Sequence, residues 1–520
     1  GFPSVLGGSG HSPPRWPSAC WTSHVVSFTV KTNMRGVVQK AHDTFNSGLT
    51  RPVEWRKKQL KNLMKMYEEN QSGMIDALVK DLRRSKTEAI LLEVDYLIND
   101  LRNTLNNFDE WVKPERVSRN KNTDDLLHIC IYYYINISSL TFPPKGLVNI
   151  LDDVVIFNEP YGVVLIIGAW NYPLQLLLLP MAADAVVIVE GGPEETTELL
   201  KQKFDYIFYT GGTNVGKIVY AAATKNLTPV TLELGGKSPV YIDNSVDMEV
   251  TAKRVLWGKF INVGQTCIAP DYVLCTKEVQ DKFVDIAKNV LKEWYGQDPQ
   301  KSPDLCRIIN HRHFSRLQAL VDASKDKIAI GGQYDSQDKF IAPTILTNVT
   351  GSDKIMEDEI FGPILPIVPI ENAYEAIKFI NAREKPLVLY VFSNHKATTS
   401  NIIENTSSGG MCVNDTVMQM GVETLPFGGV GNSGMGAYHG KASFDTFTHK
   451  KSCLLRNFAA IGEKLASGRY PPYTDGKLKL ISGLMKKRSE PSFKYLPHLL
   501  AFALGAGITY GICAWQKVKK

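Results

Sequence analysis

The sequence predicts an α/β protein in which an open parallel sheet is followed by a second α/β lobe. Its 520 residues are too many for one simple core, so two or three lobes are expected. From Val154 onward, short apolar runs such as 161–168 and 206–210 alternate with segments of helical pattern. Strands that alternate with helices favour a Rossmann-like parallel sheet, an architecture that binds dinucleotides at the carboxyl ends of its strands.

The N-terminal part is expected to be helical after a segment outside the fold. Residues 1–33 are rich in Gly, Ser, Pro and Trp and lack the basic-then-apolar order of a secretory signal. We expect this segment to be disordered, or an artefact of how the sequence was derived. In 34–111 apolar residues recur at helical spacing, as Leu91, Val94 and Leu97 do on one predicted face.

The strands that follow define two further domains. Short buried strands are predicted at 161–168, 185–189 and 206–210, and the last leads through a glycine-containing turn into a helix at 214–224. The predicted organisation is a dinucleotide-binding domain at 34–234, a second α/β domain at 235–450, a linker at 451–494 and an apolar tail at 495–515.

The apolar tail, residues 495–515, predicts a membrane anchor. It contains His498 but no formally charged residue, and lysines flank it at 494, 517, 519 and 520. Its length of about twenty residues matches the hydrocarbon core of a bilayer. A buried C-terminal helix is the alternative. Because the run ends the chain between basic residues, we expect a transmembrane tail anchor.

The composition indicates a globular enzyme without a nucleic-acid partner. Apolar residues make up 44% of the chain and charged residues 22%, and the net charge is only +6, with basic and acidic residues mixed along the chain. The eight cysteines are scattered singly, without a CxxC pair or metal-ligand spacing. We therefore expect no metal and a reducing, cytosol-facing compartment.

Two segments place reactive side chains in chemically suggestive surroundings. Cys267 lies in the polar turn 264–270, which contains a glycine and ends in proline, as a nucleophile would, although a lone cysteine is more often structural. Glu233 lies at an apolar strand end in 231–237, before a Gly-Gly pair. Burial would raise its pKa and suit it to act as a general base, whereas a surface glutamate at a strand edge is an equally good interpretation.

Asn171 follows the predicted strand 161–168 directly, in the sequence Trp-Asn-Tyr-Pro. A side-chain amide at a strand end can donate to a developing oxyanion, but on these residues alone a turn-forming asparagine is the better interpretation. Two glycine-containing runs accompany these residues. The turn 211–216 precedes a predicted helix, but its glycine spacing is not GxGxxG, so the spacing alone is only a weak indication of a dinucleotide site. The run 428–436 opens no clear helix and is interpreted as structural support.

Together, Cys267, Glu233 and Asn171 in these contexts resemble the aldehyde dehydrogenase superfamily, whose signatures read like Leu-Glu-Leu-Gly-Gly-Lys and Gly-Gln-x-Cys. The resemblance covers most of 34–450. Further agreeing stretches are 208–216, 359–363 and 426–429, while 267–272 and 435–441 are closest to the class that includes fatty aldehyde dehydrogenase, a tail-anchored enzyme.

The resemblance implies oxidation of long-chain aliphatic aldehydes to fatty acids with NAD, or NADP, as cofactor. Cys267 would attack the aldehyde, forming a thiohemiacetal and then a thioester, while the Asn171 amide and the Cys267 backbone N–H hold the oxyanion. Glu233 would activate the water that hydrolyses the thioester. The residues implied in cofactor binding are Gly211, Gly212, Thr213, Asn214, Val215, Gly216, Glu359 and Phe361.

The resemblance also implies partners and a location. The class suggests a homodimer formed through a small oligomerisation element beside the cofactor-binding and catalytic domains. With the tail, it predicts an endoplasmic reticulum membrane protein whose catalytic domain faces the cytosol.

Two stretches depart from the family pattern. Near 181–189, flanks that the family separates by a few dozen residues are joined directly, so about one βα unit of the cofactor domain is absent. That unit carries the lysine that contacts the adenosine ribose, which leaves NAD and NADP both open. Residues 121–146 look like an insertion. The alternatives are therefore a cofactor-impaired esterase or thioester hydrolase that keeps Cys267 and Glu233, and an inactive membrane-bound partner.

Overall fold

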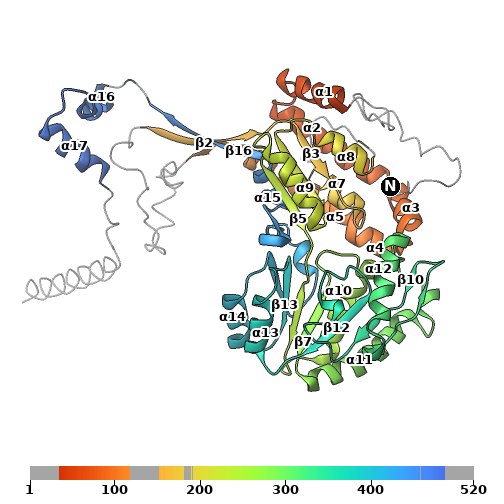
Figure 1. The fold of residues 1–520 in the computed structure, drawn as a ribbon. Helices are drawn as coiled ribbons and strands as arrows, with labels where there is room; N and C mark the ends of the chain where they lie inside the picture. The colour runs from red at the N-terminus through yellow and green to blue at the C-terminus, as the bar shows by residue number, and fades with distance from the viewer. Residues whose placement is uncertain are drawn as a thin grey trace, which may run out of the picture. The chain divides into compact units, whose positions relative to one another are not determined.

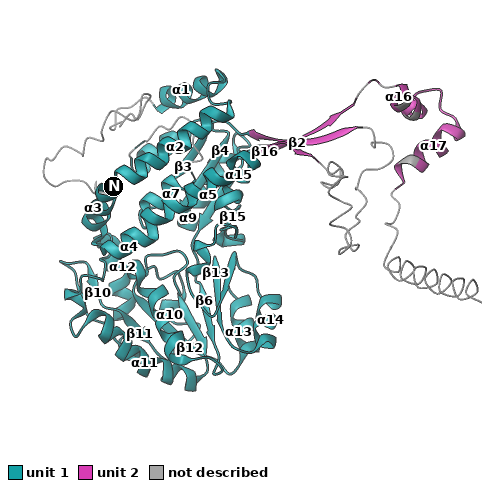
Figure 2. Cartoon of the chain, turned by 180° about the vertical axis from the view of Figure 1, so that it is seen from behind, with its two compact units in different colours: residues 1–112, 160–448 teal, residues 113–159, 449–520 magenta. Residues whose placement is uncertain are grey.

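The computed structural model describes two compact units of the chain. The described residues are 34–116, 152–180, 189, 191–456, 458 and 460–486. The first unit comprises Gly1–Val112 and Pro160–Thr448, and the second comprises Lys113–Glu159 and His449–Lys520 (Figure 2). The predictions for 1–33, 121–146, 181–188 and the tail 495–515 lie outside the described residues. Among the helices of the described part, none has the length and apolarity needed to cross a membrane.

The first unit begins with the helices predicted for 34–111 (Figure 1). They are α1 (Met34–Asn46), α2 (Val53–Glu69), α3 (Gln71–Leu82), α4 (Lys86–Ala89), the π-helix η1 (Ile90–Val94) and α5 (Asp95–Trp111). Val94 and Leu97 are buried as predicted, but Leu91 is 60% exposed. The wider turn of the π-helix shifts the helical phase between Leu91 and Val94, so the predicted face was wrong at Leu91.

A four-stranded sheet follows, with the order β15-β5-β4-β3. Its strands are β3 (Val164–Ile167), β4 (Tyr206–Gly211), β5 (Val230–Leu234) and β15 (Gly434–Met435). The first three run parallel, and β15 pairs antiparallel with β5. The accompanying helices are α7 (Pro173–Leu178), α8 (Pro193–Leu199) and α9 (Thr213–Thr224). The strand predicted at 206–210 and the helix predicted at 214–224 are confirmed.

Alternate side chains of β4 bury the two faces of this sheet in different cores. Phe208 joins a core with Leu60 of α2 and Leu101 of α5. Tyr209, the next residue, joins a core with Val38 of α1 and Val219 of α9. Because successive strand residues point to opposite faces, this alternation places helices on both sides of the sheet, as the predicted fold class requires.

The second α/β lobe contains a seven-stranded sheet with the order β14-β13-β6-β7-β12-β11-β8. Its strands are β6 (Pro239–Ile242), β7 (Tyr272–Cys275), β8 (Ile328–Ile330), β11 (Thr344–Leu346), β12 (Ile364–Pro369), β13 (Val388–Phe392) and β14 (Gly410–Val413). Neighbouring strands are parallel except β8, which is antiparallel to β11. A hairpin of β9 (Tyr334–Asp335) and β10 (Phe340–Ile341) lies outside this sheet.

Helices cover both faces of this larger sheet as well. The helices are α10 (Met248–Phe260), α11 (Lys277–Tyr295), α12 (His311–Asp322), α13 (Ala373–Asn381) and α14 (Lys396–Asn405), and α15 (Gly440–Thr446) follows β15. Val273 and Leu274 of β7 are adjacent and fully buried. Val273 packs with residues of α10 and α11, and Leu274 packs with residues of α12 and α13. Burial on both faces explains the continuous apolar runs in the sequence.

The second unit contains a three-stranded sheet with the order β1-β2-β16. Its elements are β1 (Glu115–Arg116), β2 (Asp153–Pro160), β16 (Thr448–Leu455), α16 (Ala460–Ala466) and α17 (Asp475–Met485). The range 451–494, expected to be a linker, therefore contains regular structure. Helix α17 is stabilised by its N-cap, because the Thr474 hydroxyl accepts a hydrogen bond from the Lys477 backbone N–H.

Candidate active site

Glu233 lies near the carboxyl end of β5, in the middle of the four-stranded sheet. It is opposite Thr210 of β4 on one side and Gly434 of β15 on the other. Its side chain is almost fully buried, at 1% exposure, and its Oε1 has no hydrogen-bond partner within the described ranges. A carboxyl oxygen left unpaired in this place is available to a thiol, a water or a substrate.

Cys267 follows α10 through a turn of three left-handed residues. Asn262, Val263 and Gly264 have φ values of 48°, 46° and 75°. A β-branched residue is rarely found in this conformation, and such strain is concentrated at functional sites. Gly264 is required there because a Cβ atom on it would overlap the carbonyl oxygen of Gly362. The turn brings the half-buried Cys267 back towards the smaller sheet.

Two buried amides hold this turn together. The Gln265 side chain donates to the carbonyls of Asn262 and Arg307 at 3.2 and 3.1 Å, and accepts from the Ile309 N–H at 3.0 Å. The Asn262 amide donates to the carbonyl of Gln265 at 3.1 Å. These bonds offset the backbone strain, since each is made in a buried setting where an unpaired group would be costly.

Asn171 lies between β3 and α7 and contacts the same turn. Its Nδ2 donates to the Gln265 carbonyl at 3.1 Å. The hydroxyl of the next residue, Tyr172, is 2.8 Å from that of Thr266. The two residues before Cys267 are therefore bonded to the loop that carries Asn171. The three residues predicted to be catalytic come from the loop after β3, the turn after α10 and the carboxyl end of strand β5.

The acid–base properties of the thiol and the carboxyl are coupled. Burial raises the pKa of the Glu233 carboxyl to about 8, and its hydrogen bond with the Cys267 thiol offsets part of that rise. Burial, followed by the charges of Glu233 and Glu359, raises the pKa of the Cys267 thiol well above its ordinary value. The thiol is therefore neutral in this arrangement. Forming the thiolate requires a base, and the Glu233 carboxylate is in contact with it.

The turn 211–216 joins β4 to α9 and suits the close approach of a phosphate group. Gly211 has a φ of 158°, and a Cβ atom on Gly212 would meet no atom within 4 Å. The N-terminus of the twelve-residue helix α9 is thus approachable by an anion. Gly216 allows α9 to pack directly on β5, since a Cβ there would be 2.7 Å from Leu234 Cδ2. This backbone fits the phosphates of a dinucleotide.

Glu359 and Phe361 lie on the loop before β12, close to the residues predicted to be catalytic. The Glu359 carboxyl lies against Gly235, where a Cβ atom would overlap its Oε2. Burial and then the charge of Asp271 raise its pKa to about 8. Phe361 has a left-handed φ of 50° and packs edge-on against Trp170, with 5.6 Å between ring centres. The predicted cofactor residues on this loop are therefore adjacent to Asn171 and Glu233.

Several charged residues around the site were not found from the sequence. Asp271 forms an ion pair with Lys237 at 2.6 Å, and its Oδ1 accepts from the Ile360 N–H at 3.1 Å. Arg84 and Glu93 contact the Asn171 loop. Lys237 ends the motif 231–237 that contains Glu233, so its place in the sequence could have suggested that it lies near the site. No local pattern marks Arg84 or Glu93.

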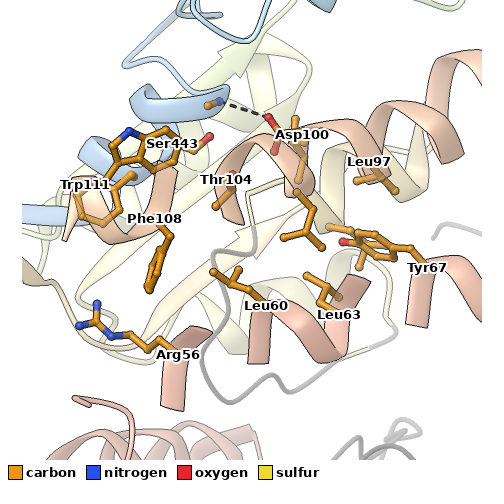
Figure 3. Close-up of a pocket in the computed structure, with 15 residues that line it drawn as sticks. Arg56, Leu60, Leu63, Tyr67, Leu97, Asp100, Thr104, Phe108, Trp111 and Ser443 are labelled. Carbon is orange, nitrogen blue, oxygen red and sulfur yellow. Dashed lines mark hydrogen bonds between the residues drawn. The ribbon is translucent and has the colours of Figure 1, made fainter. Parts of the chain in front are cut away.

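A small cavity of about 40 Å³ lies elsewhere, between α2, α5, α7 and α15 (Figure 3). Its wall is largely apolar, with Leu60, Tyr67 and Phe108 among the labelled side chains, and Asp100 hydrogen-bonded to the Gly440 N–H at 3.4 Å. None of the predicted site residues lines it. The candidate site is defined by converging side chains rather than by this cavity.

Comparisons with known proteins agree with this site. The aldehyde dehydrogenase family model matches residues 23–187 and 179–453. These two matches meet at 179–187, where the sequence predicts a missing stretch. The dimeric NADP-preferring aldehyde dehydrogenase of Mus musculus is 45% identical over 85% of this chain and 98% of its own length. Aldehyde dehydrogenase family 3 member A2 of Rattus norvegicus is 44% identical over 86% and 93%.

Solved structures confirm the fold. The substrate-bound state of Staphylococcus aureus AldH is 37% identical and covers 88% of this chain and all of its own, with a TM-score of 0.79. Succinic semialdehyde dehydrogenase from Streptococcus pyogenes, in complex with NADP+, is 20% identical with a TM-score of 0.70 over 83% of this chain and 97% of its own, which supports the fold alone. The chain belongs to the aldehyde dehydrogenase family of NAD(P)-dependent oxidoreductases.

Proposed function

We propose that this protein oxidises long-chain aliphatic aldehydes to carboxylic acids, with Cys267 as the nucleophile, Glu233 as the general base and Asn171 as an oxyanion donor. The observation that carries the proposal is the meeting of these three side chains, in which the Glu233 carboxyl contacts the Cys267 thiol and Asn171 is bonded to the same turn. The preference for long apolar aldehydes rests on the motifs at 267–272 and 435–441 and on the apolar tail.

The first step is attack of the Cys267 sulfur on the aldehyde carbon. Glu233 takes the thiol proton, because the raised pKa of the thiol leaves it unable to ionise unaided. The raised pKa of Glu233 makes its carboxylate a stronger base for this transfer. The oxygen of the aldehyde gains negative charge, which the Asn171 amide and the Cys267 backbone N–H stabilise. We assign to Gly211, Gly212, Thr213, Asn214, Val215 and Gly216 the phosphates of the cofactor, and to Glu359 and Phe361 its nicotinamide half. When bound, NAD(P)+ supplies the acceptor for the hydride lost from the thiohemiacetal.

The second step is hydrolysis of the thioester on Cys267. A water molecule must lose a proton as it attacks the acyl carbon. Glu233 first releases the thiol proton to solvent, and its unpaired Oε1 then accepts the proton from this water and returns it to the Cys267 sulfur. A carboxyl with a pKa near 8 is a stronger base than an exposed glutamate, so burial suits Glu233 to this role. The acyl carbon then leaves as a carboxylic acid, and the Cys267 thiol is restored.

We further propose a homodimer anchored at the endoplasmic reticulum membrane with its catalytic domain on the cytosolic side. The Mus musculus relative is described as dimeric. The second unit exposes apolar side chains suited to a protein contact, namely Leu454, Leu455 and Phe458. The anchor is the segment 495–515, on the strength of its sequence pattern.

The deciding experiment follows NADH or NADPH formation by the full-length protein in detergent with saturated aldehydes of increasing chain length. Cys267→Ala should abolish the reaction. Cys412→Ala is the matched control, since Cys412 is also half-buried but lies on β14. Equal rates of NAD(P)+ reduction by the wild type and by the Cys267→Ala variant would contradict the proposal. Higher kcat/KM for short aldehydes than for long ones would contradict the substrate class.

A second candidate function is cofactor-independent ester or thioester hydrolysis through Cys267 and Glu233. It is favoured by the stretch that the sequence predicts to be missing near 181–189, where the family matches this chain in two overlapping pieces instead of one. Hydrolysis of an activated ester that requires Cys267 but is insensitive to NAD(P)+, in a protein that forms no NAD(P)H, would establish it. A protein with neither activity would be an inactive member of the family.

A further inference from the structure

Three charged residues on one short segment contact both loops of the candidate active site. They are Arg84, Glu88 and Glu93, which lie from the end of α3 through α4 to the π-helix η1. We infer that this charged clamp positions the Asn171 amide relative to the Cys267 turn. The inference rests on the proposed function, in which these two groups act on the same aldehyde carbon and oxygen.

Arg84 holds the backbone of the oxyanion loop. Its side chain is completely inaccessible to solvent, and its Nη2 donates to the Asn171 carbonyl at 2.5 Å. The guanidinium carbon lies 4.7 Å from the centre of the Tyr172 ring, and the Nη1 pairs with Glu93. Only a planar guanidinium can make the carbonyl bond, the ring contact and the ion pair together.

Glu93 holds the other end of the same loop. Its Oε1 receives the ion pair from Arg84, while its Oε2 accepts from the backbone N–H groups of Leu174 and Gln175 at 2.8 and 3.1 Å. These are N–H groups of the first turn of α7, which lack partners within the helix. The loop that carries Asn171 is therefore fixed on both sides by one buried ion pair.

Glu88 extends the clamp to the Cys267 turn. Its Oε2 accepts from the Asn262 N–H at 3.0 Å, at the first of the three left-handed residues. Asn262 in turn donates from its side chain to the Asn171 carbonyl at 2.9 Å. The Asn171 carbonyl thus receives bonds from Arg84 and from Asn262, so the two loops share one acceptor whose position the clamp sets.

Stability alone does not account for this arrangement. A buried ion pair loses much hydration, and well-packed apolar side chains in its place are often as stable or more so. The clamp also carries two carboxyls for one guanidinium, and Glu88 meets the thiol of Cys306 at 3.4 Å instead of a second cation. What the charged groups provide is directional bonding to backbone groups of both loops. Displacing a reacting group by about 1 Å can cost about a hundredfold in rate.

The test compares Arg84→Met and Arg84→Lys in the full-length protein with Arg83→Met as the control. Arg83 is the neighbouring arginine, but it is exposed and pairs with Asp338 rather than with a residue of either loop. Circular dichroism and thermal melting report folding. Steady-state kinetics give kcat and KM for a long-chain aldehyde, and the Cys267-dependent cleavage of an activated ester gives a second rate.

We expect Arg84→Met to lower kcat and the ester rate by about 30- to 100-fold with the aldehyde KM within about twofold of wild type. Arg84→Lys should recover part of the loss, because its ammonium can still pair with Glu93. Arg83→Met should match wild type. A folded Arg84→Met protein with the kcat and the ester rate of the wild type would overturn the clamp.

Glu88 keeps the test decisive if Arg84→Met fails to fold. Glu88→Gln retains an oxygen that accepts from the Asn262 N–H and should keep kcat within about twofold, whereas Glu88→Ala should lower it about tenfold or more. Equal kcat in both folded variants would overturn the clamp. A wild type that turns over neither aldehyde nor ester would contradict the proposed function and, with it, the clamp. An active wild type with unchanged variants contradicts the clamp alone.

Discussion

The carboxyl group of Glu359 occupies the space in which a side chain on Gly235 would begin. A Cβ atom at Gly235 would overlap both carboxyl oxygens and the carboxyl carbon of Glu359. Glu359 is half-buried near Glu233, and partial burial together with the charge of Asp271 raises its pKa to about 8. A residue with any side chain at 235 would therefore change a group that we assign to the cofactor.

Gly235→Ala is expected to raise the KM for NAD(P)+ by about tenfold, because the Glu359 carboxyl must move away from its present place. Its effect on the melting temperature should be small, since the displaced atoms are the end of a flexible side chain. Gly73→Ala in α3 is the control, as its Cβ would meet nothing within 4 Å. That change should stabilise the helix by up to about 1 kcal/mol. Equal cofactor KM values in both variants would argue against the role of Glu359.

The rate of thioester hydrolysis is expected to rise with pH and level off above pH 8. Burial raises the pKa of Glu233 to about 8, so the carboxylate that accepts the proton from water is a minor form at pH 6. With one titrating group, about 1% of the plateau rate remains at that pH. Stopped-flow measurement of deacylation after a single turnover checks this. A pH-independent rate would show that Glu233 is not the base, whereas a half-maximal pH near 4.5 would show that burial does not raise its pKa.

Glu233→Gln is expected to stabilise the protein at pH 9 relative to wild type. A carboxyl whose pKa is higher in the folded than in the unfolded chain favours folding when protonated, and this contribution disappears as pH rises from 4.5 through about 8. The glutamine cannot ionise, so the variant and the wild type should differ least at pH 5 and most at pH 9. Urea unfolding at the two pH values measures the difference. If the wild type gained stability relative to the variant as pH rises, the pKa of Glu233 would be lowered by folding, which contradicts the prediction.

Glu93→Ala is expected to lower the free energy of unfolding by about 3–5 kcal/mol, because it leaves the Arg84 guanidinium charged and buried without its partner. Lys277→Ala is the control, because it breaks the pair of Lys277 with Asp281, in which both side chains are 57% exposed. Its effect should stay below about 1 kcal/mol. Urea midpoints of the two variants at neutral pH, compared with wild type, give the contrast. Equal effects would mean that water reaches the Arg84 site.

The parts of the fold and of the site that the sequence predicts correctly are those determined by local sequence patterns. The strand at 206–210 and the helix after it have apolar runs and a glycine turn that identify them without tertiary information. The motifs around Cys267 and Glu233 are equally local. Leu91 was misplaced because nothing in the sequence marks the π-helix that changes the phase of the helix there.

The contacts that complete the site depend on distant segments, which explains why sequence patterns did not reveal them. Arg84 contacts Asn171 across 87 positions of chain, and Asn262 contacts the same carbonyl across 91. The left-handed conformation of Val263 is opposed by its own preference and is imposed by its surroundings. The segment 451–494 was predicted to be a linker because the short helices in its described part have little apolar periodicity.

The pairing of Gly434 with Glu233 has a consequence for the synthesis of the protein. Strand β5 is made early, but its outer neighbour β15 is encoded two hundred residues later, after the whole of the seven-stranded sheet. Contacts so far apart in sequence form late, since a long loop must close before they contribute. While the chain is still on the ribosome, one edge of β5 stays open, and Glu233 acquires its final surroundings only when the second lobe has been translated. A nascent chain that stops short of residue 434 therefore holds its nucleophile without a fully enclosed base.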